Sequence, residues 1–457
     1  MSRKATSGGR NIYAELIALG LPILIGQLGM IVVSFADNIM VGHYTTEALA
    51  AASFVNNVFN VAMLACIGFT YGMTPMVGLL FGRGDRHKIG AVVRRGLRIN
   101  MVFTLLVMSA MGTLYFFVDS LGQPAELLPL IRPYYLIMLA GMFPVAVFNV
   151  FAQWSYAIDD SRTPMWIILG ANAVNLLGNY ALIYGNWGCP ELGLTGAGIA
   201  TLAARVLCPL VLVGIFFFSR RCRVYREGYR DRGLEGVSRS KVWRTSLPVS
   251  LQMAFETGAF SLSAIMAGWI GKIELAAFQI IVIVGTLGFC IYYSIGAAVS
   301  VKVANSTGAG ADTHRRMRHV ASAGYRIMLV MMCLSSLTFV FFGRTLMHAF
   351  SDDTAVLAAA GALIFPLVLY QLGDATQITF ANALRGTSHV MPMLWIAFIS
   401  YIVLGLPSTY LLAFTAGLGL WGIVLSFSVS LFAAGALFLY FFLKVTKPVN
   451  NPVENCR

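Results

Sequence analysis

Long stretches without charge constrain this chain more than any other feature of its sequence. Residues 48–82, for example, contain no Asp, Glu, Lys or Arg, and about 20 apolar residues are enough to cross a bilayer as a helix. Of the 457 residues, 58% are hydrophobic and 11% are charged, whereas about a quarter of an average soluble domain is charged. The sequence therefore excludes a soluble globular protein and predicts an all-α polytopic membrane protein.

Charged and turn-forming clusters separate the apolar segments from one another. Each segment is long enough for one transmembrane helix, and several are long enough to tilt or to extend beyond the lipid. The sequence thus predicts twelve transmembrane helices, at residues 14–41, 47–80, 97–118, 128–156, 163–185, 192–219, 245–269, 275–303, 325–343, 355–384, 391–414 and 420–443.

The basic residues predict the orientation of these spans. With a cytoplasmic N-terminus, 27 of the 32 Lys and Arg residues fall in cytoplasmic segments, and only Lys272 and Arg344 fall in outer loops. The other three, Arg132, Arg205 and Lys302, lie in spans or at their edges. Because positive residues accumulate on the cytoplasmic side, we expect both termini inside. The same rule accounts for the net charge of +13, so no nucleic-acid partner is expected.

A basic segment at residues 220–244 divides the chain into two halves of six spans each. The predicted organisation is a cytoplasmic tail (1–13), an N-lobe (14–219), the basic cytoplasmic linker (220–244), a C-lobe (245–443) and a second cytoplasmic tail (444–457). Sequence pairs recur at a constant offset of 226 residues, which indicates two parallel repeats with a cavity between them. These pairs are Leu21-Pro22 with Leu247-Pro248, residues 49–51 with 275–277, Gly82 and Gly84 with Gly308 and Gly310, and residues 192–194 with 418–420.

Enzymatic chemistry is not indicated. The chain has no P-loop, HExxH or GxSxG motif, and its seven cysteines are scattered without metal-ligand spacing. We therefore expect no enzyme activity and no cofactor.

Three of the 19 acidic residues lie well inside predicted spans: Asp37, Glu256 and Asp374. A carboxylate at the bilayer centre costs about 2.5–3.5 kcal/mol on insertion scales, so each must face a cavity, a cation or a partner. One alternative is an architectural ion pair with Arg132, Arg205 or Lys302. Another is a protonated acid with satisfied hydrogen bonds, which is itself a proton-binding site.

Polar side chains accompany these acids in each half. Asn175 and Asn179 share one helix face and, with Thr201, provide oxygen ligands for a hard cation or a proton at Asp37; ordinary interhelical hydrogen bonding is the alternative. In the second half, Gln252 stands four residues before Glu256, while Gln371, Asp374 and Gln377 form a stripe beside Tyr370. We expect Glu256 and Asp374 to line one cavity, where aromatic rings such as Phe260 and Tyr370 could bind an organic cation. Pro22 and Pro248 occupy matching places in the first span of each half, where a changing kink could gate the cavity or a static bend could suffice.

Three segments together resemble the multidrug and toxic compound extrusion (MATE) transporters, and within them the NorM-type bacterial branch. They are LGLPILIGQLGMIVVSFADNIMVG, with Pro22 and Asp37, LPVSLQMAFETGAF, with Glu256, and YQLGDATQ, with Tyr370 and Asp374. The resemblance covers nearly the whole chain. It matches the family's N-lobe cation site to Asp37, Asn175, Asn179 and Thr201, and its C-lobe acidic site to Glu256 and Asp374.

The resemblance implies an antiporter of the bacterial inner membrane. Such a protein expels amphipathic, often cationic drugs by alternating access in exchange for Na⁺ or H⁺. Na⁺ would bind at Asp37 or at Glu256 and Asp374, and the transporter would act as a monomer. Which ion and which lobe provide the coupling stay open.

Two other classes are alternatives. A lipid-linked oligosaccharide flippase of the same wider superfamily is expected to line its cavity with cations that hold a pyrophosphate, whereas the unpaired charges in this sequence are acidic. A membrane enzyme or receptor would require a nucleophile and base or a large extramembrane domain, and the sequence contains neither.

Overall fold

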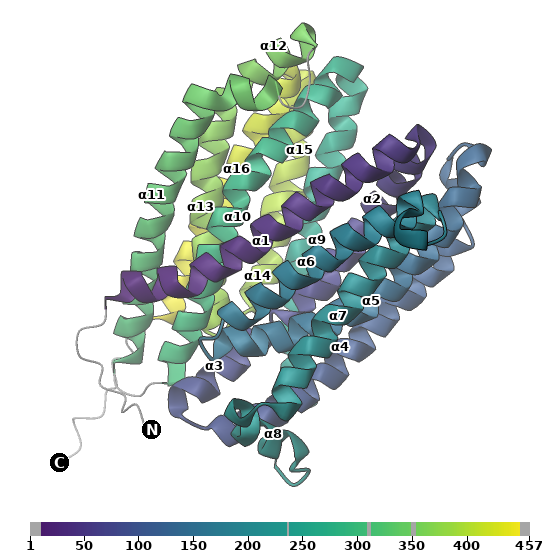
Figure 1. The fold of residues 1–457 in the computed structure, drawn as a ribbon. Helices are drawn as coiled ribbons and strands as arrows, with labels where there is room; N and C mark the ends of the chain where they lie inside the picture. The colour runs from purple at the N-terminus through teal and green to yellow at the C-terminus, as the bar shows by residue number, and fades with distance from the viewer. Residues whose placement is uncertain (1–10, 235–236, 309–311, 349–352, 448–457) are drawn as a thin grey trace, which may run out of the picture.

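A computed structural model describes residues 11–234, 237–308, 312–348 and 353–447, and within these residues the regular structure is helical throughout. Figure 1 shows long helices arranged in two groups. The helices are α1 (Ile12–Tyr44), α2 (Thr46–Thr70), α3 (Met73–Arg83), α4 (Arg86–Tyr115), α5 (Leu128–Ala157), α6 (Arg162–Tyr184), α7 (Gly193–Phe218), α8 (Arg223–Arg230), α9 (Arg239–Ile270), α10 (Lys272–Gly308), α11 (Thr313–His348), α12 (Thr354–Ala362), α13 (Ile364–Gly386), α14 (Met391–Ala397), α15 (Leu406–Tyr410) and α16 (Gly419–Val445).

Twelve spans are confirmed when one bent pair is counted as a single crossing. In the described residues, eleven helices are long and apolar enough to cross a membrane, and α12 and α13 form a twelfth span bent by 46°. Two spans are irregular in ways that the sequence did not predict. The second breaks between α2 and α3 at Tyr71 and Gly72, and the eleventh contains π-helical turns at residues 398–405 and 411–415.

Several helices begin before the apolar segments that the sequence predicts, because basic residues form their first turns. The third span begins at Arg86, not at residue 97, and α11 begins at Thr313, not at residue 325. Part of the basic linker folds as α8, which packs so closely on α4 that a Cβ on Gly90 would lie 1.9 Å from the carbonyl oxygen of Tyr225. Residues 1–10, 235–236 and 448–457 of the predicted tails and linker, and Gly310 of the repeat, lie outside the described residues.

Two equivalent glycines confirm the repeat in the backbone. Gly193 begins α7 with φ +53°, and Gly419 begins α16 with φ +56°. Both therefore adopt the left-handed conformation that glycine reaches without steric cost. We call α1–α7 the first lobe and α9–α16 the second lobe.

The lobes converge at the end of the molecule where α1 begins and α16 ends, which we call the termini end. Arg326 of α11 donates to Tyr13 at 3.0 Å, and Arg318 donates to Thr446 at 3.0 Å, so α1, α11 and α16 meet there. Toward the opposite end the two groups of helices splay apart (Figure 1).

Repeat-related glycines form the tightest part of this junction. A Cβ on Gly82 would lie 2.0 Å from the Asn305 carbonyl oxygen and 3.2 Å from Gly308, its counterpart in the repeat. A Cβ on Gly72 would lie 2.3 Å from Ser246 Oγ, so only the absence of a side chain at the break between α2 and α3 permits α9 to approach this closely.

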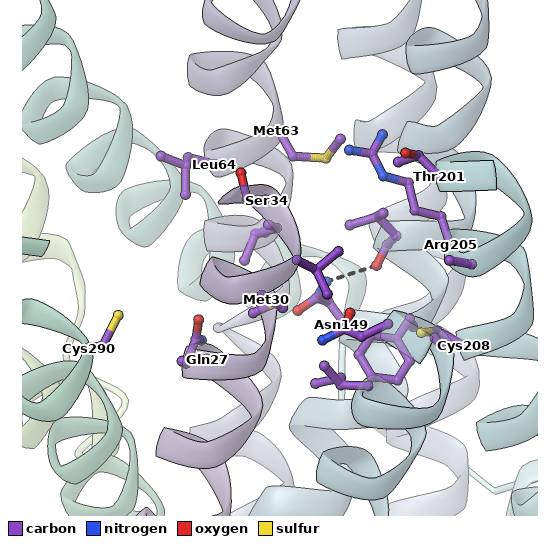
Figure 2. Close-up of a pocket in the computed structure, with 18 of the residues that line it drawn as sticks. Gln27, Met30, Ser34, Met63, Leu64, Asn149, Thr201, Arg205, Cys208 and Cys290 are labelled. Atoms are coloured by element: carbon purple, nitrogen blue, oxygen red, sulfur yellow. Dashed lines mark hydrogen bonds between the residues drawn. The ribbon is translucent and has the colours of Figure 1, made fainter. Parts of the chain in front are cut away.

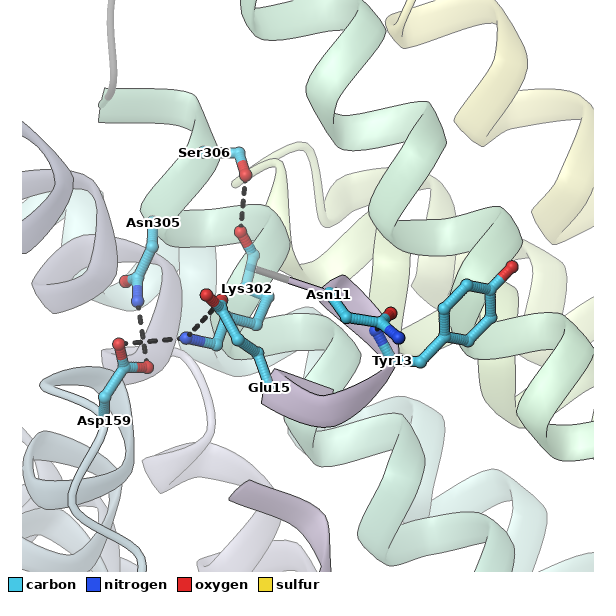
Figure 3. Close-up of polar contacts among 7 residues, drawn as sticks. All are labelled: Asn11, Tyr13, Glu15, Asp159, Lys302, Asn305 and Ser306. Carbon is cyan, nitrogen blue, oxygen red and sulfur yellow. Dashed lines mark hydrogen bonds and ion pairs between the residues drawn. The ribbon is translucent and has the colours of Figure 1, made fainter. Parts of the chain in front are cut away.

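A charged cluster also links the lobes at the termini end. Lys302 of α10 lies 3.2 Å from Glu15 and 3.0 Å from Asp159, and Asn305 donates to Asp159 at 3.3 Å (Figure 3). Asp159, in the turn after α5, has φ +67°, a conformation that Asp tolerates better than most residues. The cluster adds a charged contact between the lobes to the hydrogen bond from Arg326 to Tyr13.

Candidate functional site

A cavity of about 740 Å³ lies between the lobes, and we call it the larger cavity to distinguish it from a second one described below. Its wall includes side chains from α1, α2, α5, α6 and α7 of the first lobe and from α9, α10 and α13 of the second. Figure 2 shows Gln27 and Ser34 of α1 facing this space, with Arg205 and Thr201 of α7 across from them. The volume is within the usual range for a drug-sized ligand, about 300–1,000 Å³.

Asp37 lies on the first-lobe wall of this cavity, half-buried. Asn179, fully buried behind it, donates to Asp37 Oδ1 at 2.5 Å. When the Asn175 amide is oriented so that both its ends find partners, it donates to the same oxygen at 2.8 Å and accepts the Thr201 hydroxyl at 3.2 Å. The structure thus brings together all four residues of the predicted first-lobe set. Because both amides act on Oδ1, Oδ2 is left for a ligand in the cavity.

The second cavity, of about 260 Å³, lies in the second lobe. Glu256 of α9 and Asp374 of α13 both line it, as do Gln252, Tyr370 and Gln377. Asp374 is 3% exposed. The two acids that the sequence places on separate spans therefore share one small space.

Several oxygen atoms around this second cavity have no hydrogen-bond donor. In the described structure, Asp374 Oδ2, Gln252 Oε1 and Gln377 Oε1 are all buried without a partner. A buried acceptor without a donor costs about 1–3 kcal/mol. Such a group of oxygens suits a ligand that supplies positive charge, either a hard cation or a proton.

Gln371 departs from the prediction, because it does not line this cavity. Its oxygen accepts the hydroxyls of Ser335 at 3.2 Å and of Ser336 at 2.9 Å, both on α11. Residues three apart on a helix differ by roughly 60° in direction, so the stripe of Gln371, Asp374 and Gln377 spans a wide arc. Gln371 therefore packs against α11, whereas Asp374 and Gln377 face the cavity.

None of the three membrane acids forms an ion pair within the described residues. Arg132 pairs with Asp119 at 2.5 Å, and Lys302 belongs to the charged cluster at the termini end. Arg205 lines the larger cavity beside the Asp37 set, but its guanidinium contacts Met138 Sδ at 3.5 Å. The architectural ion pair considered from the sequence is therefore not formed.

Arg385 is the main residue that the sequence analysis missed. Its basic side chain was counted with the cytoplasmic loops, yet it is only 7% exposed and lines both cavities. Its position follows from α13, which continues as far as Gly386, between the lobes. Arg385 and Arg205 give the larger cavity two arginines beside one acid, Asp37. The sequence analysis expected acidic charges alone, and this expectation is wrong for the larger cavity.

Aromatic rings enclose the second cavity. Phe260, Tyr370 and Phe427 line it, with ring centroids 4.5 Å apart for Phe260 and Phe427 and 6.3 Å apart for Phe260 and Tyr370. Tyr401, from the π-helical turn of the eleventh span, lies close to Glu256. π-Helical turns are often found at functional sites, and here one brings a hydroxyl beside the acid.

The gating role predicted for Pro22 remains a prediction. Pro22 is buried, and α1 continues through it from Ile12 to Tyr44 without a break. Pro248 is likewise buried inside α9.

Comparisons with known proteins agree with this architecture. The MatE family model matches residues 22–181 and again residues 248–411, so the two matches begin one repeat apart. Multidrug resistance protein PmpM of Pseudomonas aeruginosa is 30% identical over 412 residues, which cover 88% of this chain and 84% of that protein.

Solved structures match over nearly the full length. The eukaryotic MATE transporter AtDTX14 has a TM-score of 0.84 at 18% identity, covering 95% of this chain and 97% of its own. A MOP superfamily transporter from Pyrococcus furiosus has a TM-score of 0.83 at 19% identity, covering 97% and 99%. These likenesses establish the fold, and together with the family match they show that the chain belongs to the MATE family of transporters.

Proposed function

We propose that this chain is a secondary multidrug exporter that exchanges amphipathic organic cations for Na⁺ or H⁺. The observation that carries the proposal is the second cavity, where Glu256 and Asp374 face one space beside unpaired oxygens and form no ion pair among the described residues, although Arg385 also lines that space. A site of this kind requires added positive charge. Both an inorganic cation or proton and the cationic group of a drug supply it, so the two ligands compete.

Competition for the same carboxylates is sufficient for exchange. When the coupling ion enters from outside and neutralises the acids, the drug loses its electrostatic attraction and leaves. In a one-for-one exchange of monovalent cations no net charge crosses the membrane, so the ion gradient alone drives the cycle. If one more positive charge enters than leaves, its movement through 100 mV provides about 2.3 kcal/mol, which supports roughly fifty-fold accumulation. Asp37, Asn175, Asn179 and Thr201 form a second candidate site for the coupling ion on the wall of the larger cavity.

Alternating access requires that the junction at the termini end open and close. We infer that this end faces the cytoplasm of a bacterial cell, so that the splayed end opens outward and the protein lies in the inner membrane. We further infer that one chain is sufficient, because both cavities are lined by a single chain.

The flippase alternative is not favoured. A flippase is expected to line its cavity with cations alone. Here Arg205 and Arg385 line the larger cavity together with Asp37, and Arg385 lines the smaller one together with Glu256 and Asp374. The similar bacterial protein is named as a multidrug resistance protein, which supports drug export.

The proposal is tested in liposomes. Transport of an ethidium-type cation is followed under an imposed Na⁺ gradient and then an imposed H⁺ gradient, for wild type and for Asp37→Asn, Glu256→Gln and Asp374→Asn. Uptake that requires one gradient and falls at least tenfold in the variants supports antiport and identifies the ion. Uptake that ignores both gradients, or that persists in all three variants, contradicts it.

A further inference from the structure

Arg385 is a buried cation without an anionic partner. It is 7% exposed, and no described Asp or Glu forms an ion pair with it. Its Nη1 donates to Asn382 at 3.1 Å, its guanidinium lies 5.0 Å from the ring centre of Tyr71, and its Nε has no partner. A buried charge with open donors is costly unless something pairs with it.

The repeat makes the missing partner more evident. Arg385 stands 226 residues after Asp159, so the two are equivalent positions of the two lobes. Asp159 is satisfied by Lys302 and Asn305. Arg385 instead lines both cavities. In the smaller one it faces the same space as Glu256 and Asp374 but forms an ion pair with neither, so its open donors are left for a ligand of the cavities.

A second unpaired donor lies close to Arg385. Ser300 of α10 is 2% exposed, lines the larger cavity, and its Oγ has no hydrogen-bond partner. A Cβ on Gly386 would lie 2.6 Å from the Ser300 carbonyl oxygen, so α10 and α13 touch beside Arg385. The hydroxyls of Tyr71 and Tyr293, also on the cavity wall, are hydrogen-bonded to each other.

We propose that Arg385 and Ser300, with Tyr71 and Tyr293 beside them, form an anion-binding subsite that takes the carboxylate of a zwitterionic amphipathic substrate. A guanidinium offers a planar fork of N–H donors that matches the two oxygens of a carboxylate. The cationic group of the same molecule is held by an acid of the cavities that Arg385 lines: Asp37 in the larger one, or Glu256 and Asp374 in the smaller one. The inference rests on the proposed export function for its biological meaning, and binding alone tests it.

The probe is a matched pair of dyes: a rhodamine zwitterion with a free carboxylate and its methyl ester, which is a simple cation. Dissociation constants of both dyes are measured by fluorescence anisotropy on the purified full chain in detergent, and transport of both is measured in liposomes. For wild type we expect the zwitterion to bind at least as tightly as the ester. In Arg385→Gln the ratio of the two constants shifts about tenfold or more against the zwitterion, as loss of a charge-assisted hydrogen bond implies.

Further variants separate the subsite from a structural role. Arg385→Lys keeps the charge without the fork and should shift the ratio less, and Ser300→Ala should shift it in the same direction. Arg205→Gln removes the other arginine of the larger cavity and should change the ratio of the two dissociation constants less than Arg385→Gln does. Thermal unfolding of each variant in detergent identifies any that fails to fold. If Arg385→Gln does not fold, the shifts of the ratio in Arg385→Lys and Ser300→Ala test the subsite, and no shift in either contradicts it.

The proposal is overturned if Arg385→Gln weakens both dyes equally, or if only Arg205→Gln changes the ratio. Absence of transport of either dye by wild type would contradict the export function and not the subsite, because the ratio of dissociation constants still decides the latter.

Discussion

The ammonium group of Lys302 lies 3.0 Å from the carboxylate of Asp159, across the interface between the two lobes. Glu15 shares the same ammonium group at 3.2 Å, and the Lys302 side chain is 14% exposed. Water screens this pair less than it screens a surface ion pair. The contact is made where the lobes converge, so it must break whenever the termini end opens.

Lys302→Gln should therefore favour opening of the termini end. Loss of a partly buried ion pair worth on the order of 1 kcal/mol shifts a two-state equilibrium about fivefold. Double electron–electron resonance gives the distances between spin labels at positions 88 and 315, one in each lobe, and so measures the populations with the termini end closed and open. Arg223→Gln is the control, because its exposed pair with Glu227 at 2.8 Å lies within α8 alone. An unchanged distance distribution in Lys302→Gln would show that the pair does not hold the lobes together.

The substitution Gly82→Ala should act on the same junction through steric overlap. Its Cβ would lie 2.0 Å from the carbonyl oxygen of Asn305, a backbone atom that cannot rotate away. We expect the lobes to separate at the termini end and transport in liposomes to fall at least tenfold, since overpacking costs about 1–3 kcal/mol. The control is Gly170→Ala on α6, where a Cβ meets open space. Wild-type transport in Gly82→Ala would mean that this contact is not required in the cycle.

Removal of the buried donor to Asp37 should tighten proton binding at the first-lobe site. Asn179→Leu keeps the size of the side chain but deletes the hydrogen bond to Asp37 Oδ1. A hydrogen bond to a charged group contributes about 1.5–3 kcal/mol and stabilises the ion-free carboxylate, so a coupling proton should bind more tightly and its concentration at half-maximal transport should fall tenfold or more. Asn186→Leu, in the turn after α6, should leave that concentration unchanged. If Asn179→Leu changes only the maximal rate, the first-lobe site does not bind the coupling ion.

The proposed orientation predicts which side of the membrane each end of the molecule faces. Single cysteines replace Trp187, in the turn after α6, or Lys88, at the start of α4, in a chain whose native cysteines are serines. A membrane-impermeant maleimide applied to intact cells should label Trp187→Cys and leave Lys88→Cys unlabelled until the cells are broken. The reverse pattern would place the termini end outside.

Much of the fold could be predicted because the bilayer reduces the problem to lengths and periods. Apolar length defined the spans, and the offset of 226 residues identified Gly82 and Gly308 as equivalent positions, which the structure brings into contact at the junction. Spacing on one helix also brought Asn175 and Asn179 to one face, and the structure has both beside Asp37.

The remainder depends on contacts that sequence spacing does not encode. Arg385 counts as a loop residue by its charge, yet α13 carries it between the lobes. Gln371 belongs to a polar stripe, yet its oxygen accepts the hydroxyls of two α11 serines outside the cavity. Gly72 is required at the break in the second span because α9 approaches it closely. In each case a partner from a distant segment decides the outcome.

The central claim is that drug and coupling ion compete for the same carboxylates. It is tested most directly by counterflow: liposomes containing the protein receive an imposed gradient of an ethidium-type cation and no ion gradient, and luminal Na⁺ and pH are recorded with fluorescent indicators. The account predicts that drug movement drives one of the two ions in the opposite direction, and that Asp374→Asn abolishes this flux. Drug movement without any ion flux, or an ion flux that survives in Asp374→Asn and in Glu256→Gln, would contradict it.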